Sequence, residues 1–146
     1  FTEVRLKTYI EMRGADAGSY KSLCALPALW TGLLYDDETL DAANDIVKKW
    51  ELNEVLNFKI ECSKSGLGAL IQKKSGWRIT EEVLEIATHG LEKRKEFNLS
   101  GENETVFLEY LFKILKTKQV TAAKILNSFN DDWGKDFKKL YEELSF

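Results

Sequence analysis

Hydrophobic and polar residues alternate strictly at the start of the chain, between Glu3 and Arg13. A period of two is typical of a β-strand with one apolar and one polar face. The even positions are Val4, Leu6, Thr8, Ile10 and Met12, and the odd positions are Glu3, Arg5, Lys7, Tyr9, Glu11 and Arg13. Because a lone strand leaves its backbone groups unpaired, we expect this strand to pair with upstream chain or with another copy.

The remaining sequence has the spacing of amphipathic helices. Two glycines and Asp16 end the strand between positions 14 and 18. The expected helices are 19–35, 36–50, one capped by Thr80, one around 106–115, one capped by Thr121 and one after Asp131 or Asp132, with 52–60 as a shorter candidate. Three glycines in 63–77 predict a loop. The pattern therefore predicts a mainly α fragment of the α+β class, with one N-terminal strand and about six helices.

The chain is predicted to form one segment over residues 1–146, because it has a single proline, Pro27, and no flexible linker. Residues 1–18 form the strand and its turn, and residues 19–146 form the helical region. The first residue is Phe1, not methionine, and the structured pattern begins at once. We therefore expect the chain to be one piece of a larger protein.

Charge and composition exclude several classes of protein. There are 21 basic and 24 acidic residues, a net charge of −3 and a pI near 5.3. This balance does not indicate a nucleic-acid partner or a polybasic membrane surface. The most apolar run, Leu23 to Tyr35, is shorter than the roughly 20 residues of a membrane-spanning helix. Two isolated cysteines, Cys24 and Cys62, favour a reducing compartment, and we expect the cytoplasm.

The polar face of the opening strand is the strongest candidate for chemistry. Glu11 and Arg13 are neighbours on that face, and Tyr9 lies on the other side of Glu11. A carboxylate can bind Mg²⁺, and a guanidinium can bind a phosphate or carboxylate through two hydrogen bonds. This combination is suited to phosphoryl transfer. The alternative is a solvated sheet face with mixed charges.

Other polar groups have simpler structural explanations. Asp16 could orient Arg13, although an aspartate in a glycine turn usually only ends a strand. The lysines of the 63–76 loop lack the spacing of a phosphate-binding loop. His89 has no second histidine for a metal site, and Cys24 is more typical of a buried thiol than of a nucleophile. Trp30 is the tryptophan nearest to the polar strand, so it joins the substrate-binding candidates, with core packing as the alternative.

Three stretches of the sequence carry a family resemblance. They are YIEMRGADAG at 9–18, LCALPALW at 23–30 and GLLYD at 32–36. Together they resemble glutamate–cysteine ligase (γ-glutamylcysteine synthetase) of the plant and alphaproteobacterial type. Weaker but collinear similarity continues through EVLEIA at 82–87, TAAKIL at 121–126 and Trp133-Gly134. The resemblance places the chain in the C-terminal portion of the family's catalytic domain.

The resemblance implies an ATP-dependent ligase with a glutamine-synthetase-like fold. Its reaction joins glutamate to cysteine through γ-glutamyl phosphate, with ATP and Mg²⁺, as the first step of glutathione synthesis. By the same resemblance, Glu11 becomes a Mg²⁺ ligand, and Arg13 becomes the catalytic cation on the phosphoryl group or glutamate. Tyr9 matches a tyrosine that lines the cysteine pocket. The upstream part of the same domain supplies the rest of the site, so we expect the isolated chain to be inactive.

The sequence departs from the family pattern at several points. Residues 19–22 are SYKS where members usually show PWRR, and Ala122 replaces a usual proline. Cys24 matches a redox-sensitive cysteine of plant members, but its partner would lie upstream, so no redox switch is predicted. Two alternatives remain open. One is a free-standing helical interaction or regulatory module, paired as a homodimer through its strand, and the other is a sibling ligase for a different amine.

Overall fold

The computed structural model describes residues 3–16 and 18–144. The strands are β1 (Val4–Leu6), β2 (Ile10–Met12), β3 (Leu70–Ile71) and β4 (Lys74–Ser75). The α-helices are α1 (Tyr20–Leu34), α2 (Asp37–Val47), α3 (Leu52–Ser65), α4 (Gly76–Arg94), α5 (Glu109–Thr117), α6 (Thr121–Asn130) and α7 (Phe137–Leu144), and two 3₁₀ helices are η1 (Gly66–Gly68) and η2 (Glu104–Leu108). The described chain is therefore mainly helical with short strands, which confirms the predicted fold class.

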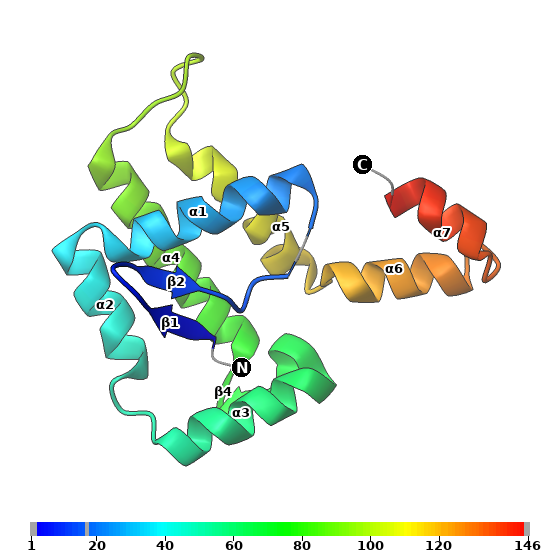
Figure 1. Cartoon of the computed structure of the whole chain (residues 1–146), viewed down its shortest axis with the longest axis horizontal. Helices are drawn as coiled ribbons and strands as arrows, with labels where there is room; N and C mark the ends of the chain where they lie inside the picture. The colour runs from blue at the N-terminus through cyan, green and yellow to red at the C-terminus, as the bar shows by residue number, and fades with distance from the viewer. Residues whose placement is uncertain (1–2, 17, 145–146) are drawn as a thin grey trace.

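The core lies where α1 crosses α4, with α2, η2 and α5 around them (Figure 1). Its buried members are small or branched apolar residues of α1, α4 and η2. They are Ala28, Leu33, Ala87, Leu91 and Leu108. Helix α1 continues through Pro27, which lies on its exposed side.

Two glycines let the backbones of α1 and α4 approach closely. A Cβ atom on Gly32 would lie 2.2 Å from the carbonyl oxygen of Ala87, and one on Gly90 would lie 2.0 Å from that of Gly32. Both distances are far below van der Waals contact, so no larger residue fits at either position without moving a helix. The crossing of α1 and α4 is therefore fixed by these glycines.

The start of α2 is tied to the end of α4. Asp36, the first residue of the predicted segment 36–50, is the N-cap of α2, because its carboxylate accepts a hydrogen bond from the Thr39 backbone N–H at 3.2 Å. The Lys93 ammonium of α4 donates to the same carboxylate at 2.7 Å and to Glu38 at 2.9 Å. Lys93 holds the pKa of Asp36 and that of Glu38 below their ordinary values, chiefly through these hydrogen bonds.

The prediction of a loop at 63–77 is wrong for most of these residues. Helix α3 continues to Ser65, and η1 and the β3–β4 hairpin follow it. Gln72 and Lys73 form the tight turn of this hairpin with φ angles of 47° and 68°. Helix α4 starts at Gly76 with Ser75 as its cap, so the predicted cap at Thr80 lies inside the helix, where its hydroxyl donates to the Gly76 carbonyl. The turn was not predicted from the sequence because neither of its central residues is glycine or asparagine.

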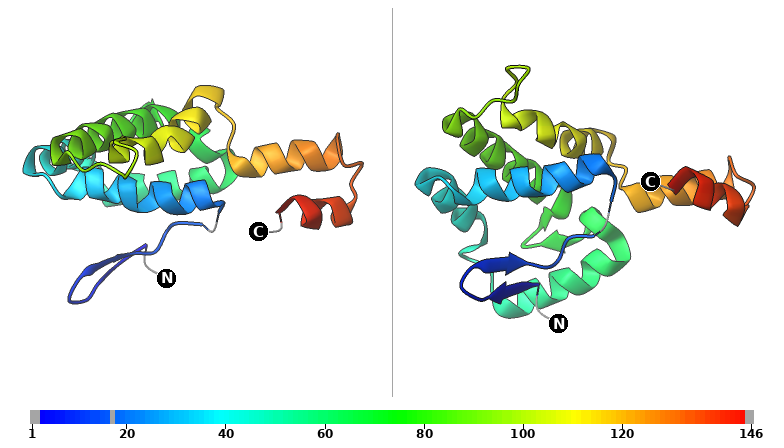
Figure 2. Two further views of the ribbon diagram at one scale, coloured as in Figure 1. Left: turned by 90° about the horizontal axis from the view of Figure 1, so that it is seen from above. Right: turned by 45° about the horizontal axis from the view of Figure 1, so that its top comes forward.

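The predicted continuous strand at the N-terminus is instead a hairpin. β1 and β2 pair antiparallel with Val4 opposite Met12, Arg5 opposite Glu11 and Leu6 opposite Ile10. By folding on itself, the segment pairs the inner-edge backbone groups of its two strands, which a single strand cannot do. The hairpin lies outside the helical body (Figure 2), and Glu3 links it to Lys59 of α3 by an ion pair.

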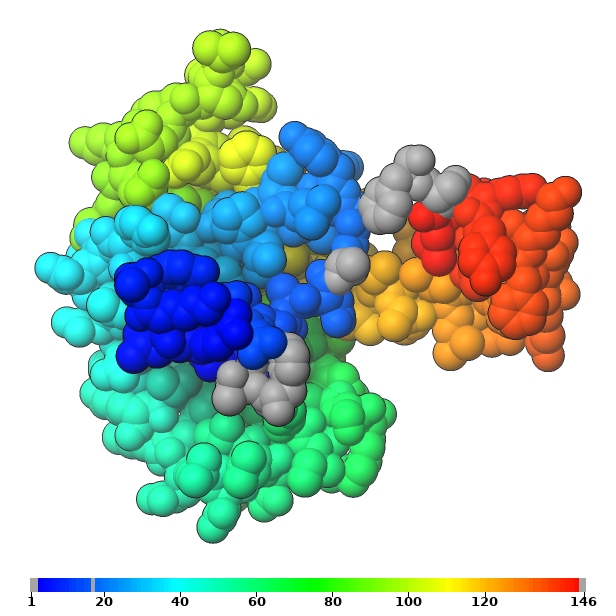
Figure 3. Space-filling model, viewed as in Figure 1, coloured from blue at the N-terminus to red at the C-terminus, as the bar shows by residue number. Residues whose placement is uncertain are grey.

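Helices α6 and α7 form an arm that projects from the body (Figure 3). Helix α6 begins at the predicted Thr121, but its cap residue is Val120, and Asp136 rather than Asp131 or Asp132 accepts a hydrogen bond at the start of α7. An apolar groove of about 380 Å³ runs between the two helices. Its lining is Ala122, Ile125, Leu126, Phe129, Phe137 and Leu140. Among the helices of the described residues, none is both long enough and apolar enough to cross a bilayer.

Candidate functional site

The polar face of the β1–β2 hairpin brings a carboxylate between two guanidinium groups. The Arg5 Nε donates to Glu11 Oε2 at 2.5 Å, and the Arg5 Nη2 donates to Glu11 Oε1 at 3.0 Å. The Arg13 Nε lies 3.7 Å from Glu11 Oε2. Arg5 and Glu11 meet because they face each other across the two strands. The side chains of Glu11 and Arg13 are 30% and 25% exposed, so an incoming ligand can reach both.

Arg5 is the functional candidate that the sequence analysis did not select. It stands on the same odd-numbered face as Glu11, so the period-two pattern already placed it on the polar side. Its direct contact with Glu11 depends on the chain reversal, which pairs positions 5 and 11. No local sequence signal indicated that reversal.

The other predicted site residues, Tyr9, Asp16 and Trp30, lie in three different parts of the structure. Tyr9 is beside the hairpin turn, 57% exposed, with the Lys7 ammonium 5.9 Å from its ring centroid. Asp16 is exposed in the segment between β2 and α1. Trp30 is partly buried on α1, where it packs against the core. The structure therefore brings Glu11 and Arg13 together, and it places Trp30 in the helical body.

The residues of the hairpin do not form a complete magnesium site. Within residues 3–16 and 18–144, no group of three His, Cys, Asp or Glu side chains is arranged to hold a metal ion. Both oxygens of Glu11 accept hydrogen bonds from Arg5. Mg²⁺ requires near-octahedral oxygen coordination, so Glu11 could supply one ligand at most. The described part of this chain does not by itself fit the metal.

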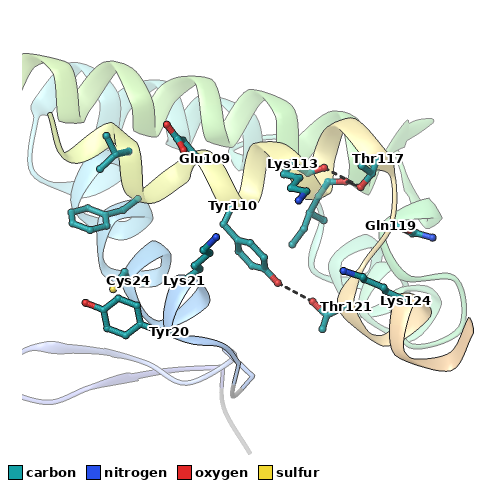
Figure 4. A pocket seen from close by; sticks show the side chains of 13 residues that line it. Tyr20, Lys21, Cys24, Glu109, Tyr110, Lys113, Thr117, Gln119, Thr121 and Lys124 are labelled. Carbon is teal, nitrogen blue, oxygen red and sulfur yellow. Dashed lines mark hydrogen bonds between the residues drawn. The ribbon is translucent and has the colours of Figure 1, made fainter. Parts of the chain in front are cut away.

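A second site, which the sequence analysis did not predict, is a cavity of about 470 Å³ (Figure 4). It lies between the first turns of α1 and the segment from η2 to α6. Its charged lining consists of Lys21, Lys113, Lys124 and Glu109. Its other lining residues are Tyr20, Cys24, Val106, Phe107, Tyr110, Ile114, Thr117, Gln119 and Thr121. The lysines come from three different helices, so only the tertiary fold reveals that they share one site.

Hydrogen bonds order the centre of this cavity. The Tyr110 hydroxyl shares a hydrogen bond with the Thr121 hydroxyl at 3.1 Å. This bond, with further ones to Ser22 and Ser19 and the charge of Lys124, lowers the pKa of Tyr110 despite its partial burial. At the α1 side, a hydrogen bond with Cys24 raises the pKa of Tyr20.

Comparison with known proteins gives one consistent result. The sequence profile of "Glutamate-cysteine ligase family 2" matches residues 1–143. The chain is 38% identical over 146 residues to the chloroplastic glutamate–cysteine ligase of Arabidopsis thaliana and 37% identical to that of Solanum lycopersicum. It is 36% identical over 148 residues to the chloroplastic glutamate–cysteine ligase A of Oryza sativa subsp. indica. In each case the match covers 100% of this chain and 27% or 28% of the relative, so the chain spans about a quarter of their length.

Proposed function

The chain belongs to glutamate–cysteine ligase family 2, and on that premise we propose that it is the C-terminal part of an ATP-dependent carboxylate–amine ligase. The proposal is carried by the match of the family profile over residues 1–143. The named activity of the relatives supports glutamate as the acid and cysteine as the amine, and the choice of the glutamate side chain is part of our proposal. Because those relatives are several times longer, the activity is assigned to a longer protein that includes this segment.

The proposed reaction has two steps. The γ-phosphoryl group of ATP passes to the γ-carboxylate of glutamate, which forms an acyl phosphate and releases ADP. The amine of cysteine then attacks the carbonyl carbon, the phosphate group leaves, and the nitrogen loses a proton. Both steps need cations near the negative charge that builds up on the carboxylate and phosphate oxygens.

The hairpin supplies suitable cations for this proposed role. Arg13 is the more buried of the two arginines next to Glu11, with 25% of its side chain exposed against 44% for Arg5. A partly buried guanidinium binds phosphate or carboxylate oxygens more strongly than a fully hydrated one, since less water competes for them. We assign Arg13 to the reacting carboxylate or phosphoryl group and Arg5 to holding the carboxylate of Glu11 in place.

We also propose roles for three further residues, Tyr9, Asp16 and Trp30. Tyr9 is accessible beside the hairpin turn, so its ring and hydroxyl are available to line a pocket for cysteine. Asp16 is exposed in the segment that leaves β2, from where it can support Arg13. Trp30 packs against the core but is only partly buried, so part of its surface is available for the proposed contribution to substrate binding. ATP and Mg²⁺ would be bound mainly by residues elsewhere in the longer protein.

The decisive experiment measures phosphate release from Mg-ATP by the whole natural protein that contains this chain. Glutamate and cysteine are supplied together and singly, and the parent is compared with Glu11→Gln. We expect release that needs both amino acids and falls by about 100-fold in the variant, since the carboxylate that orients two guanidinium groups is lost. The matched control is Glu61→Gln, which removes an exposed carboxylate from α3.

Each outcome has a definite meaning. Release that depends on glutamate but proceeds equally with another amine would overturn cysteine as the substrate. The absence of release from a well-folded parent would overturn the ligase assignment. Equal activity in Glu11→Gln and Glu61→Gln would leave the ligase intact and remove the hairpin face from its active site.

A free-standing interaction module is the second candidate function. The observation in its favour is the exposed apolar face of the hairpin, where Val4, Leu6 and Ile10 are 50%, 81% and 59% exposed. A homodimer that buries these faces would remove their apolar side chains from water without any upstream chain. Sedimentation of the 146-residue chain separates the candidates, because the module predicts a discrete dimer that Leu6→Lys converts to a monomer.

A further inference from the structure

The cavity between α1, α5 and α6 concentrates positive charge that the protein does not neutralise. In the part of the chain that the structure describes, Lys21, Lys113 and Lys124 line this cavity, and none of them forms an ion pair. Glu109 is the one carboxylate among its described lining residues. In Figure 4, Lys21 lies on one side of Tyr110 and Lys113 and Lys124 lie on the other, and Glu109 is on the same side as Lys21. Like charges converging on a concave surface attract an anion.

The place of these lysines, rather than the lack of an ion pair, distinguishes them. Lys48, Lys64 and Lys74 each have a carboxylate within 2.8 Å, whereas other exposed lysines such as Lys116 form no ion pair within the described residues. The three lysines of the cavity differ from Lys116 because they line one concave site. The chain is acidic overall, with a net charge of −3. A cavity with a surplus of positive charge is therefore not a consequence of general composition.

The lining also indicates the chemical class of the anion. The cations are lysines, which bind phosphate as point charges, whereas planar carboxylates are favoured by the two-pronged geometry of arginine. The hydroxyls of Tyr110 and Thr121 can add hydrogen bonds to phosphate oxygens. The side chains of Val106, Phe107 and Ile114 offer an apolar wall for an uncharged part of the ligand. A volume of about 470 Å³ is within the range of small-molecule sites.

We propose that this cavity binds a small phosphate-bearing metabolite, with Lys21, Lys113 and Lys124 around its phosphate groups and Tyr110 at the centre of the site. The site goes beyond the proposed ligase reaction and does not depend on it. Its lining includes none of Tyr9, Glu11, Arg13, Asp16 and Trp30. The ligand therefore binds separately from the hairpin face.

The lowered pKa of Tyr110 agrees with this arrangement. Hydrogen bonding to Thr121 contributes most to that shift, and the positive charge of Lys124 contributes to it as well. A phosphate bound beside Lys124 would compensate that charge.

The test uses the whole natural protein and inorganic pyrophosphate as the probe. Lysine accessibility is measured residue by residue, as the rate of reductive methylation followed by mass spectrometry. We expect pyrophosphate to slow modification of Lys113 and Lys124 by roughly three- to tenfold with a saturable dose dependence, since a charge-assisted contact shields the amine. Lys116, an exposed lysine on the same helix α5 that does not line the cavity, is expected to react at an unchanged rate.

Variants and a second anion complete the experiment. Lys113→Met and Tyr110→Phe are expected to raise the pyrophosphate concentration needed for half-maximal protection of Lys124 by roughly tenfold. Lys116→Met, which also removes one positive charge from α5, is expected to leave that concentration unchanged. Citrate at matched ionic strength is expected to protect less than pyrophosphate, and equal protection would overturn the phosphate assignment. Equal effects of Lys113→Met and Lys116→Met, or no protection in the parent, would overturn the site itself. Because the readout is lysine modification, the result is independent of ligase activity.

Discussion

At the scale of single residues, the arrangement around Glu11 depends on pairing rather than on sequence spacing. The alternating pattern placed Glu11 and Arg13 on one face, and the structure keeps them within 3.7 Å. The stronger contact, from Arg5, connects residues on opposite strands of a hairpin. Sequence reasoning follows one strand at a time, so it identified the first pair and missed the second.

Asp36 offers a residue-level prediction about pH. Its pKa is lowered chiefly by the hydrogen bond from Lys93, so the ion pair stabilises the fold above the ordinary pKa of 3.8. This stabilisation is lost as pH falls through the lowered value in the folded state. We expect Asp36→Asn to make the free energy of unfolding less dependent on pH below about 4. Asparagine is an equally good helix cap, so the variant removes the charge and keeps the cap of α2.

Urea unfolding followed by tryptophan fluorescence between pH 3 and pH 7 measures this effect. Asp37→Asn is the control, because Asp37 is exposed on the first turn of α2 and forms no ion pair within the described residues. Parallel pH profiles for the parent and Asp36→Asn would contradict the role given to the Lys93 contact. At the alkaline end the same pair loses its contribution as pH rises through the pKa of Lys93, which the two carboxylates raise above 10.5.

At the scale of secondary structure, the helices were predictable and the hairpins were not. The start of α2 was predicted to within one residue because acidic residues at the beginning of a helix are a local signal. The β3–β4 turn lacks such a signal. Its left-handed Gln72 is held by tertiary contacts, since its amide donates to the Lys49 carbonyl at 3.1 Å and to Glu54 at 2.7 Å. Contacts of this kind are invisible to a reading of local sequence.

The crossing of α1 and α4 gives the second prediction. Gly90→Ala places a methyl group within 2.0 Å of the Gly32 carbonyl oxygen, so one helix must move away. We expect a loss of about 3 kcal/mol in the free energy of unfolding, at the upper end for overpacked cores. Denaturant unfolding of the 146-residue chain measures it.

Gly68→Ala is the matched control for that variant. Gly68 ends η1, and a Cβ atom there meets nothing within 4 Å. The same chemical change is therefore expected to alter the free energy of unfolding by less than about 1 kcal/mol. Similar losses in both variants would mean that the close approach of α1 and α4 is not what makes Gly90 necessary.

At the scale of the whole molecule, the chain consists of a packed helical body with two appendages. The N-terminal hairpin is linked to α3 through the Glu3–Lys59 ion pair, and the α6–α7 arm projects from the other side (Figures 1 and 2). Mainly helical composition was predictable from periodicity. The separation into a body and two appendages was not predictable from the sequence, because it depends on which apolar faces pack against one another in the tertiary structure.

This architecture predicts a gradient of local stability. We expect backbone amides of residues 3–16 to exchange with deuterium much faster than those of residues 84–91, where Leu84, Ala87 and Leu91 are at most 1% exposed. Hydrogen exchange with mass spectrometry on the 146-residue chain tests this expectation. Protection of the hairpin equal to that of α4 would contradict it, and protection that appears only in the longer natural protein would show that the rest of the domain covers the hairpin.

The pair of glycines at the α1–α4 crossing also has a kinetic meaning. Residues 35–75 lie between these two helices, so the chain must close a long loop before the crossing can form. In the packed structure, a Cβ atom at Gly32 or Gly90 would collide with the backbone of the facing helix, so the two helices must meet in a register that brings the two glycines together. We expect the closure of this loop onto the α1–α4 crossing to slow the folding of the helical body.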